Sequence, residues 1–199
     1  MIATIKAEWR KNRFRPAFLV SSGLIAGIVV LSYGVRWYQA LHPGTGERGG
    51  IVPIAVLYPD QFVNAVMGAG FPIGAAIAIV LGALIAGSEY SWGTMKTTLT
   101  QGPGRLTTWF GRVVAFEAWM AILSVVLFVV GAASSVVVAS FQGHAITSPA
   151  FVDIAKGLGA IWLVFAVNGA IGLALGTLIR SSAPALGAGL IYVQRLLRI

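Results

Sequence analysis

Long apolar stretches separated by short polar segments dominate the pattern of this chain. Each of the first four stretches reaches or exceeds the about 20 residues that a helix needs to cross the hydrocarbon core of a bilayer. They predict transmembrane spans at about residues 17–35, 61–87, 109–139 and 157–179. A shorter apolar segment at 183–199 predicts a partial fifth helix. Glycine, proline and charged residues between the spans predict loops at residues 36–60 and 140–156.

Two features inside the spans concern how the helices bend and pack. Pro72 stands between Gly70 and Gly74 in the second span, which predicts a kink or an interfacial start of that helix. In the first span Gly23-x-x-x-Gly27 is a candidate face for close helix packing, although glycine is common throughout the chain.

The residues before the first span predict a helix that lies in the membrane interface, at about residues 2–15. The apolar residues Ile2, Ile5, Trp9 and Phe14 alternate there with the basic residues Lys6, Arg10, Lys11, Arg13 and Arg15. Such a segment places its apolar face at the headgroup level and its basic face toward anionic lipid. A disordered basic tail is the alternative interpretation of the same residues.

The polar segment between the second and third spans predicts a short helix of its own, at about residues 89–100. Ser88 or Ser91 can cap its N-terminus, where the negative charge of Glu89 also suits the helix dipole. Apolar side chains recur on it at near-helical spacing, namely Tyr90, Trp92, Met95 and Leu99. Gly102-Pro103-Gly104 then ends it. An amphipathic helix of this kind can lie along the cytoplasmic face of the membrane and pass force from a soluble partner into the spans.

Composition agrees with a chain that is solvated mainly by lipid. Hydrophobic residues make up 57% and charged residues 10% of the 199 residues, and the mean hydropathy is +0.85. Soluble domains carry about 25% charged residues, so this chain has too little polar surface to coat a water-soluble globule. We therefore predict an all-α, polytopic transmembrane helical bundle with a single domain at residues 1–199. No cysteine is present, which excludes disulfides and thiolate chemistry.

The basic residues gather on one side of the predicted spans. Nine of them fall on the side of the N-terminus, namely Lys6, Arg10, Lys11, Arg13, Arg15, Lys96, Arg105, Arg112 and Arg180. The opposite side carries Arg36, Arg48 and Lys156 beside the acidic Glu47, Asp60 and Asp153. The positive-inside rule therefore places the N-terminus in the cytoplasm of a multi-pass cell-membrane protein. Because the charges flank apolar segments, the net charge of +8 does not indicate nucleic-acid binding.

The sequence contains no motif for catalysis, cofactors or metals. The G-x-x-x-x-G-K-[ST] phosphate loop is absent, and Gly102-Pro103-Gly104-Arg105 lacks its Lys-Ser/Thr pair, so the chain is not expected to hydrolyse ATP. H-E-x-x-H is absent, and His42 and His144 lie far apart in two loops. No Ser/His/Asp set assembles on one side of the membrane, so the chain is not expected to be an enzyme.

Two polar residues inside the spans are candidates for the substrate pathway or for coupling. Glu117 lies about eight residues into the third span, and an ionisable group within a span is a functional candidate by default. The alternative is a structural role, in which Glu117 pairs with Arg112 or another basic residue on the cytoplasmic side, or faces water at the mouth of the bundle. Asn168 in the fourth span is more readily interpreted as an interhelical hydrogen-bonding residue than as a substrate ligand.

The stretch between the second and third spans resembles the signature of the ABC-2 type transporter permease family. The residues that carry this resemblance are Glu89, Tyr90, Gly93, Thr94, Lys96, Thr97, Leu99, Gly102, Pro103, Gly104 and Arg105, followed by Arg112 at the start of the third span. The basic N-terminal helix, the order of the spans and the turn Arg180-Ser181-Ser182-Ala183 agree with the family as well. Only the stretch from Glu89 to Arg112 is specific.

This resemblance implies the membrane-spanning subunit of an ATP-driven transporter, usually an exporter. A separate nucleotide-binding ATPase subunit would bind ATP and Mg, and a second permease chain would complete the transporter. The helix at 89–100 would be the coupling helix that docks on the ATPase. The residues implied in docking are Glu89, Tyr90, Trp92, Gly93, Thr94, Lys96 and Arg105.

Two other functions remain open at this stage. Family members usually have six spans, whereas this chain ends within its fifth apolar segment, which favours a non-transporting scaffold or regulatory subunit. A secondary transporter is less favoured, because such proteins usually carry internal repeats and several buried ionisable groups.

Overall fold

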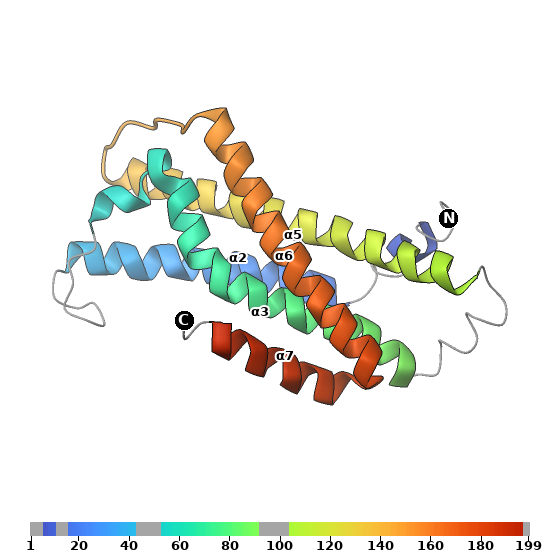
Figure 1. Ribbon diagram of the computed structural model, residues 1–199. Coiled ribbons are helices and arrows are strands. Elements are labelled where there is room, and N and C mark those ends of the chain that lie inside the picture. The colour runs from blue at the N-terminus through green and yellow to red at the C-terminus, as the bar shows by residue number, and fades with distance from the viewer. Residues whose placement is uncertain (1–5, 11–15, 43–52, 92–103, 197–199) are drawn as a thin grey trace. The chain divides into compact units, whose positions relative to one another are not determined.

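The computed structural model describes residues 6–10, 16–42, 53–91 and 104–196. Residues 6–10 are helical, and no residue in the described ranges forms a strand. The longer helices are α2 (Pro16–Leu41), α3 (Phe62–Ser91), α5 (Arg105–Phe141), α6 (Phe151–Ile179) and α7 (Ser182–Leu196), which Figure 1 labels along the chain. Two short 3-10 helices, η1 (Ile54–Leu57) and η2 (Pro59–Gln61), precede α3. The described chain is therefore all-α.

Several of these helices have the length and apolarity of membrane spans. By these two criteria Pro16–Leu41, Leu106–Phe141 and Phe151–Ile179 can each cross a bilayer. A fourth crossing is counted if residues 59–68 and 73–88 form one broken span, and their break falls where Pro72 predicts a kink. In contrast, α7 has 15 residues, fewer than the about 20 that a crossing needs. A helical membrane protein is the class that these elements support.

Some helices extend beyond the spans predicted from hydropathy, because the sequence lacks a helix breaker where the apolar stretch ends. Although a loop is predicted from Arg36, α2 continues to Leu41, and the first breaker is Pro43. The end of α5 at Phe141 is set by Gly143, whose φ of 64° is left-handed.

The C-terminus of α5 is a Schellman motif. The amide of His144 donates to the carbonyl of Ala139 at 3.0 Å, and the amide of Gly143 donates to that of Ser140 at 3.4 Å. These two bonds satisfy carbonyl groups that the helix end would otherwise leave unpaired. The connection to α6 is thus residues 142–150, shorter than the loop predicted from the sequence.

The helices divide between two compact units. Unit 1 comprises Met1–Ser21, Pro72–Ile122 and Trp162–Ile199, whereas unit 2 comprises Ser22–Phe71 and Leu123–Ile161. Four helices, α2, α3, α5 and α6, contribute one part to each unit, and α7 lies wholly in unit 1. Unit 1 contains the helix ends that flank the predicted coupling helix.

Candidate functional site

The predicted coupling helix overlaps the end of α3. Glu89 and Tyr90 lie in the last turn of α3, which ends at Ser91. The hydroxyl of Ser88 donates to the carbonyl of Ile85 at 3.2 Å, so Ser88 bonds back onto α3 and does not cap a new helix. The predicted docking residues Trp92, Gly93, Thr94 and Lys96 lie outside the described residues. Arg105 is the first residue of α5.

The end of α3 packs against the turn between α6 and α7 with no room for a side chain. A Cβ atom added to Gly87 would lie 2.6 Å from Cα and 2.7 Å from the amide nitrogen of Ser182. Because these are backbone atoms, no rotamer change can relieve the clash. Gly87 therefore fixes the segment that leads into residues 92–103 directly on the first residue of α7.

The same close approach continues along α3 and α6. A Cβ atom on Gly172 would meet the carbonyl oxygen of Ile79, and one on Gly82 would meet the carbonyl oxygen of Gly169. On Gly176 it would lie 2.8 Å from the carbonyl oxygen of Ala83. Small residues in membrane helices allow backbones to approach in this way. We call Gly82, Gly87, Gly172 and Gly176 the glycine junction.

The turn that receives α3 contains the only non-glycine residue with positive φ among the described residues. Arg180 has φ 57°, and its amide donates to the carbonyl of Gly176 at 3.1 Å. A left-handed conformation costs an L-residue about 1–2 kcal/mol, so the surrounding contacts must hold this turn in place. The tight turn predicted at Arg180-Ser181-Ser182 is the observed link, since α7 begins at Ser182.

The start of α5 packs against the N-terminal residues within unit 1. The ring of Trp119 lies 4.6 Å from that of Phe18 and 5.7 Å from that of Trp9, measured between ring centroids. Arg112 and Glu8 are both buried in this unit. Trp9 belongs to the segment predicted as an interfacial helix, and of this segment the described residues 6–10 pack on α5 through the ring of Trp9.

Glu117 lies near one end of the uncharged part of α5. Residues 118–138 carry no charge, and Phe18, at the start of α2, contacts Trp119 two residues further along α5. The Oε2 atom of Glu117 is buried and has no hydrogen-bond partner among the residues that the structure describes. No ion pair between the carboxylate of Glu117 and the guanidinium of Arg112 is seen in the described part of the chain. The two lie five residues apart, which separates them by about 140° around the helix.

Glu117 and Asn168 make different contacts. The indole Nε1 of Trp162 donates to the backbone carbonyl of Glu117 at 3.5 Å, a long bond between α6 and α5. The amide Nδ2 of Asn168 donates to the carbonyl of Val164 at 2.8 Å, within α6 itself. The interhelical bond expected of this amide group is therefore replaced by one to its own helix.

The glycine junction is the feature that sequence reasoning missed. The sequence singles out Gly23 and Gly27 as a packing face, but a Cβ atom on either would meet nothing within 4 Å. Gly172-x-x-x-Gly176 has the same spacing, and it is this pair that packs on α3. Spacing alone does not distinguish the two pairs. Facing small residues on a second helix, here Gly82 and Ala86, are the signal that would have found the junction.

Comparisons of the chain with protein-family models, with curated proteins and with solved structures find no match in any of the three.

Proposed function

We propose that this chain is the membrane-spanning permease subunit of an ATP-driven transporter, and that residues 88–104 carry motion from a nucleotide-binding ATPase into the helices. The observation that carries the proposal is the contact of Gly87 with Ser182, directly before this segment. It is supported by the resemblance of Glu89 to Arg112 to the ABC-2 type permease signature. An export direction and a second permease chain follow from the resemblance alone.

The glycine junction supplies a physical route for such coupling. A displacement of the chain after Ser91 acts on the last turn of α3, where Gly87 meets the backbone of Ser182. Because backbone atoms in contact cannot absorb a shift by changing rotamer, the displacement passes to α6 and α7. Gly176 and Gly172 extend the contact along α6. The junction would thus act as a rigid link between the docking segment and two further helices.

The proposal predicts a phosphate-loop ATPase in a neighbouring reading frame, and it is tested by reconstituting the chain with that ATPase. Copurification and ATP hydrolysis in proteoliposomes are measured for Trp92→Ala and Lys96→Glu, with Lys156→Glu as a charge-matched control on an exposed residue of α6. We expect the first two changes to reduce copurification and the control to leave it unchanged. If all three behave as the unaltered chain does, residues 92–96 do not dock the ATPase.

A further variant separates docking from transmission. Gly87→Ala leaves residues 92–104 intact but forces the end of α3 away from Ser182. We expect the ATPase to copurify with this variant while its activity loses its dependence on the membrane subunit. If the unaltered chain copurifies with the ATPase but never changes its activity, the chain is a scaffold and not a transporting subunit.

Membrane sidedness provides an independent test, and the absence of cysteine makes it direct. Thr97→Cys and Thr147→Cys are matched substitutions in the two polar segments that the charge pattern assigns to opposite sides. In intact cells a membrane-impermeant maleimide should label Thr147→Cys, and it should reach Thr97→Cys only after permeabilisation. Labelling of Thr97→Cys from outside would exclude docking of a cytoplasmic ATPase on this segment.

A further inference from the structure

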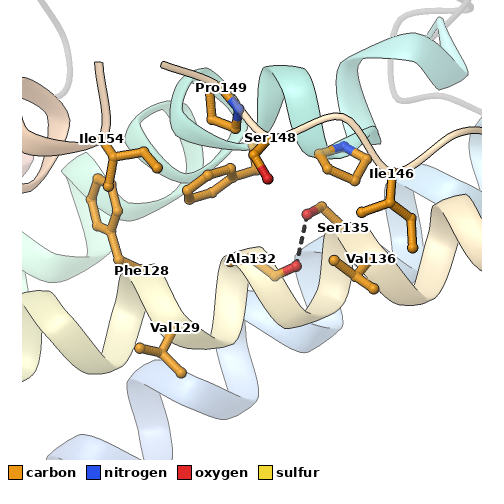
Figure 2. A pocket seen from close by; sticks show the side chains of 11 residues that line it. Phe128, Val129, Ala132, Ser135, Val136, Ile146, Ser148, Pro149 and Ile154 are labelled. Carbon is orange, nitrogen blue, oxygen red and sulfur yellow. Dashed lines mark hydrogen bonds between the residues drawn. The ribbon is translucent and has the colours of Figure 1, made fainter. Parts of the chain in front are cut away.

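Unit 2 contains an apolar pocket of about 300 Å³ between α5, the start of α3 and the connection to α6 (Figure 2). Its volume is at the lower end of the about 300–1,000 Å³ that is typical of small-molecule sites. The lining residues are Pro59, Phe62, Phe128, Val129, Ala132, Ser135, Val136, Ile146, Ser148, Pro149 and Ile154. None of these lining residues is charged, so the pocket suits an uncharged, apolar group.

The hydroxyl groups in the lining do not change this chemistry. Ser135 is fully buried, and its hydroxyl donates to the carbonyl of Ala132 at 2.8 Å, as the dashed line in Figure 2 marks. This hydroxyl proton is therefore already used within α5. Ser148 lies in the connection between α5 and α6, beside the apolar lining residues Ile146 and Pro149. An occupant would meet mainly the side chains of Phe and of branched aliphatic residues.

The lining of the pocket follows α5 for about two turns. Its lining runs from Phe128 to Val136, eight residues that correspond to about 12 Å along the helix axis. Near the same end of α5, the rings of Trp37 and Phe141 lie 5.4 Å apart, an aromatic pair typical of a membrane interface. Along the helix axis, Val136 lies about 8 Å and Phe128 about 20 Å inward from Phe141, so the lining reaches the level of the bilayer midplane, which is about 15 Å deep.

The pocket opens on a face of α5 that is available to lipid. Val129 is 61% exposed, and Val125 and Val136 are exposed on the same face of the helix. Ile146, in the connection, is 58% exposed at the other side of the opening. Because α5 is long and apolar enough to cross a bilayer, acyl chains would surround these residues.

The geometry points to a binding site for one acyl chain of a membrane phospholipid. The acyl chain enters between Val129 and Ile146 and lies along α5 against Phe128 and Ala132. The phospholipid headgroup then lies level with the exposed connection at residues 142–148. An apolar pocket that opens on a lipid-accessible face of α5 is continuously exposed to this ligand. The inference does not depend on a transport function, since it rests only on the pocket and on the apolar face of α5.

The test uses the full chain in nanodiscs that contain a phospholipid with a photoreactive diazirine near the end of one acyl chain. After illumination, the labelled peptides are mapped by mass spectrometry in the unaltered chain and in two variants. Ala132→Phe fills the pocket, whereas Ala133→Phe adds the same ring at the next, exposed position of α5, outside the lining. Ile146→Trp narrows the opening from a segment outside the helices and so covers the case in which Ala132→Phe does not fold.

We expect adducts on the lining residues of the unaltered chain, their loss in Ala132→Phe and Ile146→Trp, and their retention in Ala133→Phe. Equal labelling in Ala132→Phe and Ala133→Phe would show that the diazirine reports only general contact with lipid and would overturn the site. A parallel sample carries a free fatty acid with the same diazirine, and labelling of the lining by this probe alone would exclude a phospholipid as the source. Cross-links between lining peptides of two copies of the chain, in place of lipid adducts, would assign the pocket to a protein interface and overturn the inference as well.

Discussion

Both units contain glycines that face side chains, such as Gly74, Gly169 and Gly189 in unit 1, but among the described residues only unit 1 has glycines that face the backbone of another element. In unit 1, a Cβ atom on each residue of the glycine junction would meet backbone atoms of another helix or turn. In unit 2, a Cβ atom on Gly131 would meet the side chain of Val66, and one on Gly157 would meet those of Val63 and Phe128. Unit 2 also holds the apolar pocket.

This difference separates a rigid region from a region that can adapt. Side chains can change rotamer to admit an added group, whereas a backbone in contact with another backbone can only move as a whole. Unit 1 is therefore suited to pass on a displacement at the end of α3. Unit 2 is suited to accommodate a ligand beside Phe128, because its spacing is set by side chains.

The largest expected effect comes from adding one methyl group to each unit. Gly172→Ala in unit 1 places a Cβ atom against the carbonyl oxygen of Ile79. We expect the free energy of unfolding to fall by about 3 kcal/mol, the upper end of the usual cost of overpacking. Gly131→Ala in unit 2 meets Val66 through its side chain, so we expect a loss of about 1 kcal/mol. The free energy of unfolding is measured by titrating SDS into mixed micelles.

The control for both variants is Gly159→Ala, because a Cβ atom at this position of α6 would meet nothing within 4 Å. Alanine has the higher helix propensity, so this change should be neutral or stabilise by up to about 1 kcal/mol. A loss in Gly131→Ala as large as that in Gly172→Ala would remove the distinction between the units.

The sequence predicts the helices better than it predicts their contacts. Hydropathy locates the apolar core of each long helix, because a bilayer requires a long uninterrupted apolar stretch. Helix ends depend on local bonds that hydropathy does not measure, so the Schellman motif at Gly143 and the continuation of α2 to Leu41 were not foreseen. Glu89 and Glu117 are candidates because they are ionisable. The residue type identifies the charged group but not the side chains that surround it.

Which helix face packs and which meets lipid is harder still to predict. Both environments are apolar, so the hydrophobic pattern does not distinguish them. Gly23 and Gly172 stand in equally apolar helices, yet only Gly172 faces another backbone. The pocket in unit 2 was unforeseen for the same reason, since its lining joins residues of α5 to residues of the connection that follows.

A second comparison concerns the left-handed residue at one helix end in each unit. Gly143 follows α5 in unit 2, and Arg180 follows α6 in unit 1, with φ values of 64° and 57°. We expect Gly143→Ala to destabilise by about 1 kcal/mol, because alanine is strained in this conformation. Arg180→Gly should be neutral or stabilise by up to about 1 kcal/mol. Glycine relieves the backbone strain in the folded state, and the greater freedom that it gives the unfolded chain offsets part of this gain.

Both variants are assayed by thermal denaturation in detergent, with recovery from size-exclusion chromatography as the readout. Destabilisation by Arg180→Gly would mean that its side chain holds the turn through contacts that outweigh the strain. The rigidity of unit 1 would then depend on Arg180 as well as on the glycine junction.

The aromatic contacts of unit 1 are expected to contribute less. Trp9 and Trp119 have ring centroids 5.7 Å apart, and aromatic pairs of this kind contribute about 0.5–1.5 kcal/mol beyond their burial. A double-mutant cycle with Trp9→Ala and Trp119→Ala should give a coupling free energy in this range. A matched cycle in unit 2 uses Trp37→Ala and Phe141→Ala, whose rings lie 5.4 Å apart. Zero coupling for the first pair would show that the N-terminal segment does not stabilise the start of α5.

The smallest effect is expected from Asn168, although an amide inside a membrane helix is often a bond between helices. Its Nδ2 atom already donates to the carbonyl of Val164 in the same helix, so Asn168→Leu removes no described contact between α6 and α5. Hydrogen bonds between membrane helices average about 0.6 kcal/mol, and we expect a smaller loss here in the SDS titration. Trp162→Phe is the matched variant, since it removes the long bond from Nε1 to the carbonyl of Glu117 on α5. If Asn168→Leu costs more than Gly172→Ala, polar side chains and not backbone contacts hold unit 1 together, and the mechanical contrast with unit 2 fails.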